Sequence, residues 1–168
     1  MYMSTAARLN MRSTEKKVLK YYDDGGKKGR GNCTWGIGIL AHRGPCTKAE
    51  LARVVTDADI EREFQSRLRV AERGVERDVK AQLSQAQFDA LVSFAYNAGV
   101  DGSSKVFERL NAGDFDGAAN AIAAKNFGHE RRKGKFVKVV YPGLVTRRAE
   151  EAAPFRNAAD AQLRSASK

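Results

Sequence analysis

Residues 13–38, with the sequence STEKKVLKYYDDGGKKGRGNCTWGIG, decide the fold class of this chain. The segments VLKYY and TWGIGIL, in and just beyond this stretch, are rich in β-branched and aromatic residues, and glycines gather between them. Such a pattern is typical of strands joined by a turn. Residues 17–40 are the only strand-like region, so we expect one small sheet near the N-terminus.

Helical patterns dominate after residue 46. Thr47–Glu50 and Ser84–Gln87 have the form of capping boxes, which predict helix starts. Thr56 is expected to cap a long helix, and Gly74 inside that helix is expected to weaken or bend it. The apolar face of this helix recurs at steps of three or four: Ile60, Phe64, Leu68, Ala71, Val75 and Val79.

The segment QFDALVSFAYNAG, residues 87–99, is apolar around most of its helical surface. A helix of this kind must be enclosed, so we predict that it is central and that Leu91 and Phe94 are buried. Gly99 is expected to end it.

The last third of the chain is predicted to be helical apart from one loop. Short helices are expected near Ser104–Leu110 and Asp114–Ala124. The basic stretch 129–142, HERRKGKFVKVVYP, is predicted to be a loop. Pro142 suits the start of a final helix, and Pro154 is predicted to break that helix into two pieces.

Together these patterns predict an α+β fold that is mainly helical. A small β-lobe, about residues 16–46, and a larger helical lobe, about residues 56–168 with the N-terminal helix, are expected to be joined by the long helix. The chain, 1–168, is predicted to be one domain, with a ligand cleft between the lobes.

Composition and charge limit the class of protein. Hydrophobic residues make up 42% and charged residues 30% of the chain, values typical of a globular protein. No run of about 18 apolar residues is present, so we expect no membrane insertion. The first 17 residues contain no apolar core, so we expect no secretory signal. The net charge of +10 predicts attraction to a polyanion: nucleic acid, anionic lipid or an acidic cell wall.

Two cysteines, Cys33 and Cys46, flank one short segment. They could pair in an oxidising compartment, but the simpler interpretation is two buried free thiols.

A pair of carboxylates could support glycoside hydrolysis, which needs a proton donor and a second carboxylate across the sugar ring. Glu15 is expected to end the first predicted helix, and Asp24 lies nine positions later at the first turn of the sheet. Thr34 could hold the attacking water, and Gly36 and Gly38 could let a sugar approach the backbone. By spacing alone, solvated charges around a hairpin turn are the favoured interpretation of these residues.

Several motifs that occur in a fixed order along the chain favour the catalytic interpretation over the interpretation as surface charges. Glu15, then Tyr22-Asp23-Asp24, then Thr34-Trp35-Gly36-Ile37-Gly38 resembles the pattern of the phage T4-type lysozymes, the endolysin family of muramidases. The resemblance continues through residues 87–99, through LNAGDFDGAANAI at 110–122 and through GLVTRRAEE at 143–151. It covers roughly residues 5–155 in the family's order.

The resemblance implies a role for each matching residue. Glu15 would be the general acid, Asp24 the second carboxylate, and Thr34 would assist the attacking water. Asp23, one position out of phase, is expected to be a turn or cap residue.

The resemblance also implies which residues bind the saccharide: Leu40, Tyr96 and Asn97. No cofactor is expected, and no metal, because no ligand spacing accompanies His42 or His129, which we expect to face solvent.

The chain departs from the family pattern in three places. Lys16 follows the acid where the family has glycine, and Ile39 stands where the family has histidine. Nine residues separate Asp24 from Thr34 where the family has five, and the extra residues lie in GGKKGRGN, residues 25–32.

The implied function is hydrolysis of the β-1,4 bond between N-acetylmuramic acid and N-acetylglucosamine in bacterial peptidoglycan, leading to host cell lysis. The enzyme is expected to be a monomer that accumulates in the host cytoplasm and reaches the periplasmic wall through a lesion made by a holin-type membrane protein. A secreted antibacterial effector with the same catalytic domain is an open alternative. The alternative activities are a lytic transglycosylase, which forms an anhydro product, and a basic nucleic-acid-binding module, for which no recognised motif is present.

We predict that the basic residues of the insert act by charge. Replacing Lys27, Lys28 and Arg30 together by Gln should lower wall binding and activity at low salt and have little effect near about 0.3 M salt, because the Debye length is only about 8 Å at 0.15 M. Turbidity assays across a salt series measure this. An equal loss at every salt concentration would mean that the insert shapes the active site directly.

Overall fold

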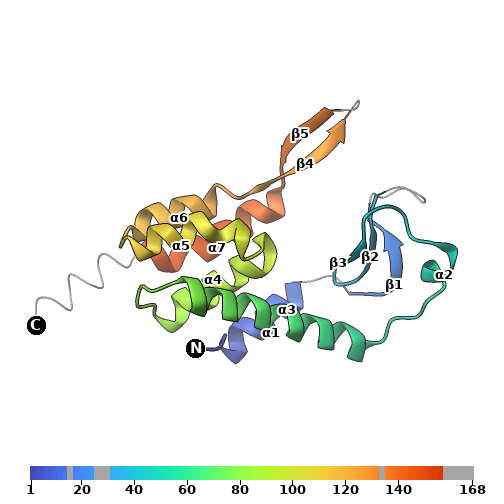
Figure 1. The fold of residues 1–168 in the computed structure, drawn as a ribbon, viewed down its shortest axis with the longest axis horizontal. Helices are drawn as coiled ribbons and strands as arrows, with labels where there is room; N and C mark the ends of the chain where they lie inside the picture. Colours follow the sequence, from blue (N-terminus) through green and yellow to red (C-terminus); the bar gives the residue numbers. More distant parts are fainter. Residues whose placement is uncertain (15–16, 25–30, 133–134, 157–168) are drawn as a thin grey trace, which may run out of the picture. The chain divides into compact units, whose positions relative to one another are not determined.

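The computed structural model describes residues 1–14, 17–24, 31–132 and 135–156 (Figure 1). In chain order the elements are α1 (Thr5–Thr14), β1 (Val18–Asp23), β2 (Cys33–Gly36), β3 (Ile39–His42), α2 (Lys48–Leu51), α3 (Asp57–Asp78), α4 (Gln85–Ala98), the 3-10 helix η1 (Asp101–Ser103), α5 (Ser104–Asn111), α6 (Phe115–Ala123), β4 (Phe127–Arg132), β5 (Lys135–Val140) and α7 (Pro142–Arg156). The predicted fold class, α+β and mainly helical with an N-terminal sheet, is confirmed.

The chain divides into two compact units. We call Thr5–Arg67 the sheet unit, and Met1–Ser4 together with Leu68–Lys168 the helical unit. The helix α3 contributes residues to both. The predicted lobe boundaries, the single catalytic domain and the cleft stay predictions.

The sheet of the sheet unit has three antiparallel strands in the order β1-β2-β3. The run TWGIGIL forms two strands, because a turn at Ile37 and Gly38 separates β2 from β3. Gly36 and Gly38 have φ values of +63° and +83°, which favour glycine.

Gly36 has a different role from the predicted one. It is buried, and a β-carbon there would lie 3.1 Å from Cγ1 of Ile60 and 3.3 Å from Cδ1 of Ile39. Its missing side chain makes room for the sheet to pack on α3, so the sugar approach predicted at Gly36 is wrong. Gly38 is exposed and has no atom within 4 Å of its β-carbon position.

The two cysteines form a disulfide, so the interpretation as free thiols is wrong. The bond joins Cys33, the first residue of β2, to Cys46, which lies just before α2. The sequence separation of 13 residues corresponds to a chain-entropy stabilisation of about 3 kcal/mol. Sequence spacing did not reveal the pairing, because it depends on where the sheet brings the α2 segment.

The long helix α3 begins as predicted. The Thr56 N–H donates to Oδ2 of Asp59 at 3.1 Å, and the Asp59 N–H donates to Oγ1 of Thr56 at 3.1 Å. Five residues of the predicted apolar face are at most 2% exposed: Ile60, Phe64, Leu68, Ala71 and Val75. Val79, predicted to continue that face, lies just beyond the helix and is half-buried.

Gly74 in α3 allows a close packing contact. A β-carbon at this position would lie 2.5 Å from Cγ2 of Val100, which is closer than side-chain atoms approach one another. The glycine therefore makes room for Val100 within the helical unit.

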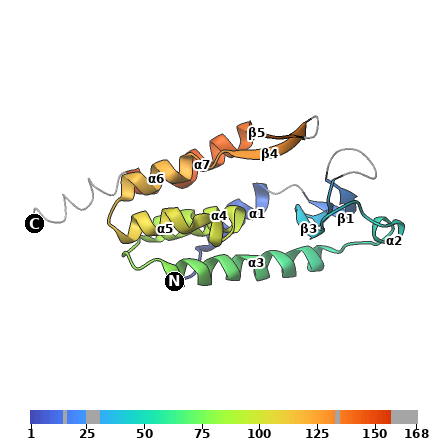
Figure 2. The ribbon, with the colours of Figure 1, turned by 45° about the horizontal axis from the view of Figure 1, so that its top comes forward.

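The helical unit is built around α4, as predicted. Leu91 and Phe94 are fully buried, and the Ser84 hydroxyl accepts from the Gln87 N–H in a capping box. Gly99 follows the helix with φ of +80°. The helix α7 packs against α4 and α6, and α5 packs against α6 (Figure 2).

The predicted loop at 129–142 is wrong, because this stretch lies largely in an antiparallel hairpin of β4 and β5. Six residue pairs run in register from Phe127↔Val140 to Arg132↔Lys135. The charged residues gave the segment a loop-like composition, but β-branched residues at Val137, Val139 and Val140 favour an extended strand.

The predicted helix break at Pro154 is also wrong, because α7 continues to Arg156. Phe155 is fully buried, and the Pro154 carbonyl accepts from Nε2 of Gln87 at 3.2 Å. These contacts hold the last turn in place although proline supplies no N–H. No helix among the described residues is long and apolar enough to cross a membrane.

We predict that Leu91→Ala lowers the free energy of unfolding by about 2–5 kcal/mol, because it leaves a cavity in a fully buried position. Leu9→Ala is the matched control: Leu9 is 66% exposed, so the change should lie within about 0.5 kcal/mol of zero. Urea denaturation measures both. A loss below 1 kcal/mol for Leu91→Ala would contradict a central position of α4.

Candidate active site

Asp24 directly follows β1 and is held by two hydrogen bonds to the backbone of Asn32. Its N–H donates to the Asn32 carbonyl at 3.1 Å, and its Oδ1 accepts from the Asn32 N–H at 2.7 Å. The side chain is exposed. One carboxylate oxygen is therefore held by the backbone while the group keeps access to solvent.

Thr34 lies beside the second carboxylate oxygen. Its Oγ1 is 3.4 Å from Oδ2 of Asp24 and 3.3 Å from the Asn32 carbonyl oxygen. Thr34 is 4% exposed and lies in β2, between Tyr22 of β1 and Leu40 of β3. The hairpin thus brings Asp24 and Thr34 together despite the longer connection between them.

Asp23 has a separate role, consistent with its predicted use as a turn residue. Its Oδ1 accepts from the Cys46 N–H at 2.7 Å. The two neighbouring carboxylates therefore have different partners: Asp23 secures the segment before α2, and Asp24 lies beside Thr34.

The remaining predicted residues of the sheet unit are only partly described. Leu40 is 46% exposed and stands opposite Thr34 on β3, where an apolar group is available to a ligand. Glu15 lies outside the described residues, and so do Lys16 and the insert residues Lys27, Lys28 and Arg30.

In the helical unit, Tyr96 and Asn97 lie on the last turn of α4. Tyr96 is half-buried and Asn97 is exposed. The Asn97 Oδ1 accepts a hydrogen bond from Nη2 of Arg148 on α7. This contact orients the Asn97 amide, so its Nδ2 group points away from the guanidinium.

Arg148 is a charged residue inside the helical unit, with 2% of its surface exposed. Its Nε donates to the Lys125 carbonyl at 3.0 Å, and its guanidinium lies 4.8 Å from the centroid of the Phe94 ring. Nη1 donates to Oε2 of Glu151. Every side of this guanidinium has a polar or aromatic partner, as a buried cation requires.

Glu151 completes this network and was not recognised from the sequence. It is 5% exposed, and its Oε1 accepts from the Ser93 hydroxyl at 2.7 Å and from Nε of Arg147 at 3.0 Å. The preceding residue, Glu150, is also a glutamate but is exposed. The spacing of Glu151 three and four residues after two arginines was the available signal.

A cluster of possible metal donors lies on the sheet unit. The donor atoms of Cys33, His42 and Glu50 all lie within 4.8 Å of one another. His42 is exposed, as predicted, but its Nε2 is 2.9 Å from Oε1 of Glu50. The sequence analysis missed this group because its members have no familiar ligand spacing.

The fold and the residues of the candidate site agree with the protein family whose sequence model this chain matches. The phage lysozyme family matches residues 12–151, which is most of the chain. The chain therefore belongs to the phage lysozyme family.

Individual relatives support this assignment. The endolysin of Bacillus phage B103 is 46% identical over 80 residues, which cover 46% of this chain and 27% of that endolysin. Among solved structures, the endolysin of Escherichia coli O157:H7 phage FAHEc1 is 26% identical with a TM-score of 0.71, and the match covers 94% of this chain and 95% of that one. The muramidase domain of SpmX from Asticaccaulis excentricus is 28% identical with a TM-score of 0.66, covering 91% and 96%.

We predict that Asp24→Asn lowers activity on purified cell walls by at least about 100-fold, because it removes the carboxylate that is expected to act as the base. Asp23→Asn, the matched control, should stay close to wild type, since an amide oxygen can still accept from the Cys46 N–H. Turbidity loss of the walls measures both, and circular dichroism checks folding. A larger loss for Asp23→Asn would reverse the assignment of the two residues.

Proposed function

We propose that this chain is a muramidase that hydrolyses the β-1,4 bond between N-acetylmuramic acid and N-acetylglucosamine in peptidoglycan and so causes host cell lysis. The observation that carries the proposal is the arrangement of Asp24: one carboxylate oxygen bound by the Asn32 N–H, the other 3.4 Å from the Thr34 hydroxyl. Membership of the phage lysozyme family supports it.

In the proposed reaction Glu15 donates a proton to the leaving glycosidic oxygen. Asp24 accepts a proton from the attacking water, and Thr34 helps to hold that water. The network around Asp24 favours this role, because hydrogen bonds to the carboxylate orient it without removing it from solvent. In an inverting enzyme the two carboxyl groups would be about 6.5–9.5 Å apart, which leaves room for the water.

We assign saccharide binding to Leu40, Tyr96 and Asn97. Leu40 offers an exposed apolar surface, and sugar rings have apolar faces that pack on such groups. Asn97 offers an amide already oriented by Arg148. An oriented amide can distinguish a donor from an acceptor on an N-acetyl sugar.

The net charge of +10 supports an anionic substrate such as the cell wall. It would also suit a nucleic-acid-binding module, but the presence of Asp24 beside Thr34 favours hydrolysis. A lytic transglycosylase is the second enzymatic candidate, because it acts on the same bond with one acidic residue and no water.

The delivery route follows from the proposed function. The enzyme would act as a monomer, collect in the host cytoplasm and reach the periplasmic wall after a holin-type protein opens the membrane. Assays on intact cells with and without a holin test this route separately from the chemistry.

Mass analysis of digested peptidoglycan tests the reaction itself. Reducing muropeptides are the expected products of hydrolysis. Anhydro muropeptides would instead identify a transglycosylase, and no release of fragments, together with a gel shift of nucleic acid, would favour the binding module.

We predict that Glu15→Gln abolishes wall lysis while the protein stays folded, because the amide has the same shape but no acidic proton to give. General acid catalysis contributes about 10²–10⁴-fold in rate. Glu150→Gln is the matched control, since Glu150 is exposed and has no assigned role. More than a tenth of wild-type activity in Glu15→Gln would overturn the assignment.

A further inference from the structure

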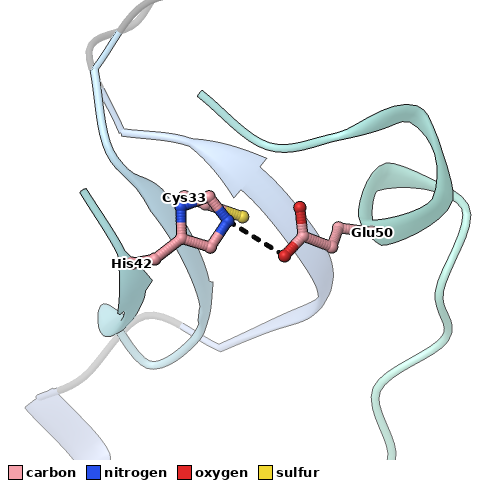
Figure 3. Close-up of side chains that lie close together, drawn as sticks. All are labelled: Cys33, His42 and Glu50. Carbon is pink, nitrogen blue, oxygen red and sulfur yellow. Dashed lines mark hydrogen bonds and ion pairs between the residues drawn. The ribbon is translucent and has the colours of Figure 1, made fainter. Parts of the chain in front are cut away.

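We propose that the reduced chain binds one zinc ion through Cys33, His42, Cys46 and Glu50, and that the disulfide form does not. Figure 3 shows three of these side chains: His42 from β3 and Glu50 from α2 point toward one another beside the sulfur of Cys33. Cys46 belongs to the same group because its sulfur is bonded to that of Cys33. The site goes beyond the proposed hydrolysis and does not depend on it.

His42 is already oriented as a metal ligand. Its Nδ1–H donates to the Arg43 carbonyl at 3.1 Å, so Nε2 is the nitrogen left to bind an ion once it has given up its own proton. Nε2 is the nitrogen that faces Glu50, at 2.9 Å from Oε1. A backbone carbonyl on the far nitrogen is the usual support of a metal-binding histidine.

Glu50 is held by the capping box of α2. Its Oε2 accepts from the Thr47 N–H and the Thr47 hydroxyl, both at 2.7 Å. Its other oxygen, Oε1, accepts from Nε2–H of His42, and an ion bound to both side chains would replace this contact.

The backbone of each cysteine is held beside His42 and Glu50 by a hydrogen bond of its own. Cys33 stands opposite His42 in the β2–β3 ladder, and its N–H donates to the Gly44 carbonyl at 2.7 Å. The Cys46 N–H donates to Asp23 at 2.7 Å. These backbone contacts do not use the sulfur atoms, so they can persist when the disulfide is reduced.

Zinc binding requires reduction of the disulfide between Cys33 and Cys46, and a dithiol can supply the two electrons and two protons. Two electrons pass from the dithiol to the disulfide, the reductant becomes a disulfide itself, and the two protons go to the sulfurs of Cys33 and Cys46. The ion then displaces these two thiol protons and the Nε2 proton of His42, all three passing to solvent, so that two thiolates, one neutral imidazole and one carboxylate surround it.

The spacing suits zinc. Zinc bonds of about 2.0–2.3 Å place neighbouring donor atoms of a tetrahedron about 3.3–3.8 Å apart. The donors of Cys33, His42 and Glu50 lie within 4.8 Å of one another, so shifts of about 1 Å would bring these three to that spacing. The sulfur of Cys46, bonded to that of Cys33 in the oxidised form, must also move away from it after reduction. Two sulfur donors and one imidazole favour zinc over magnesium or calcium, which prefer oxygen.

The first test compares the two redox forms of the wild-type protein. With Co²⁺ as a spectroscopic substitute, the reduced chain should show a thiolate-to-metal charge-transfer band that saturates at one ion per chain, and the oxidised chain should show none. Zinc should abolish the band, and it should raise the melting temperature of the reduced protein only. Equal binding by both forms, or none by the reduced form, would overturn the proposal.

Variants assign the ligands. The Cys33→Ser, Cys46→Ser double variant should lose the charge-transfer band, and His42→Gln or Glu50→Gln should weaken zinc binding by at least about tenfold. His129→Gln and Glu108→Gln are the matched controls and should bind as the wild type does. If the His42 variant binds as tightly as the His129 variant, the proposed site is wrong, whatever its effect on wall lysis.

Discussion

The candidate catalytic side of the sheet unit depends on the link between Cys33 and Cys46. The bond joins β2 to the segment before α2. Asp23, on the neighbouring strand β1, accepts a hydrogen bond from the Cys46 N–H. Asp24 and Thr34 follow directly in sequence from residues fixed in this way. The link therefore adds to the support that these two side chains receive from the three-stranded sheet and its packing on α3.

Much of the fold could be predicted from the sequence, because local rules agree with the final packing. The capping box at Ser84 and the apolar surface around Leu91 both specify α4 without reference to the rest of the chain. The rules failed where tertiary contacts outweighed local preference. Burial of Phe155 holds a helical turn that contains Pro154, and strand pairing gave an extended structure to the basic stretch at 129–142.

The candidate site could be predicted in part for the same reason. Asp24 and Thr34 lie on one hairpin, so their proximity follows from sequence order and strand pairing. Glu151 could not be recognised as the partner of Arg148, because two adjacent glutamates differ only in the helix face they occupy. The disulfide likewise depends on where α2 meets the sheet, which no local pattern encodes.

The buried guanidinium of Arg148 affects the order in which contacts can form while the chain is being translated. Asn97 lies on α4, but the arginine that orients its amide is made about fifty residues later and needs Glu151 beside it. The helix α4 can therefore form early during translation, while its last turn acquires its final polar partners only after α7 has left the exit tunnel. A nascent chain that stopped before α7 would lack the arginine that orients the Asn97 amide, so the proposed saccharide-binding surface would be completed only after synthesis has passed Glu151.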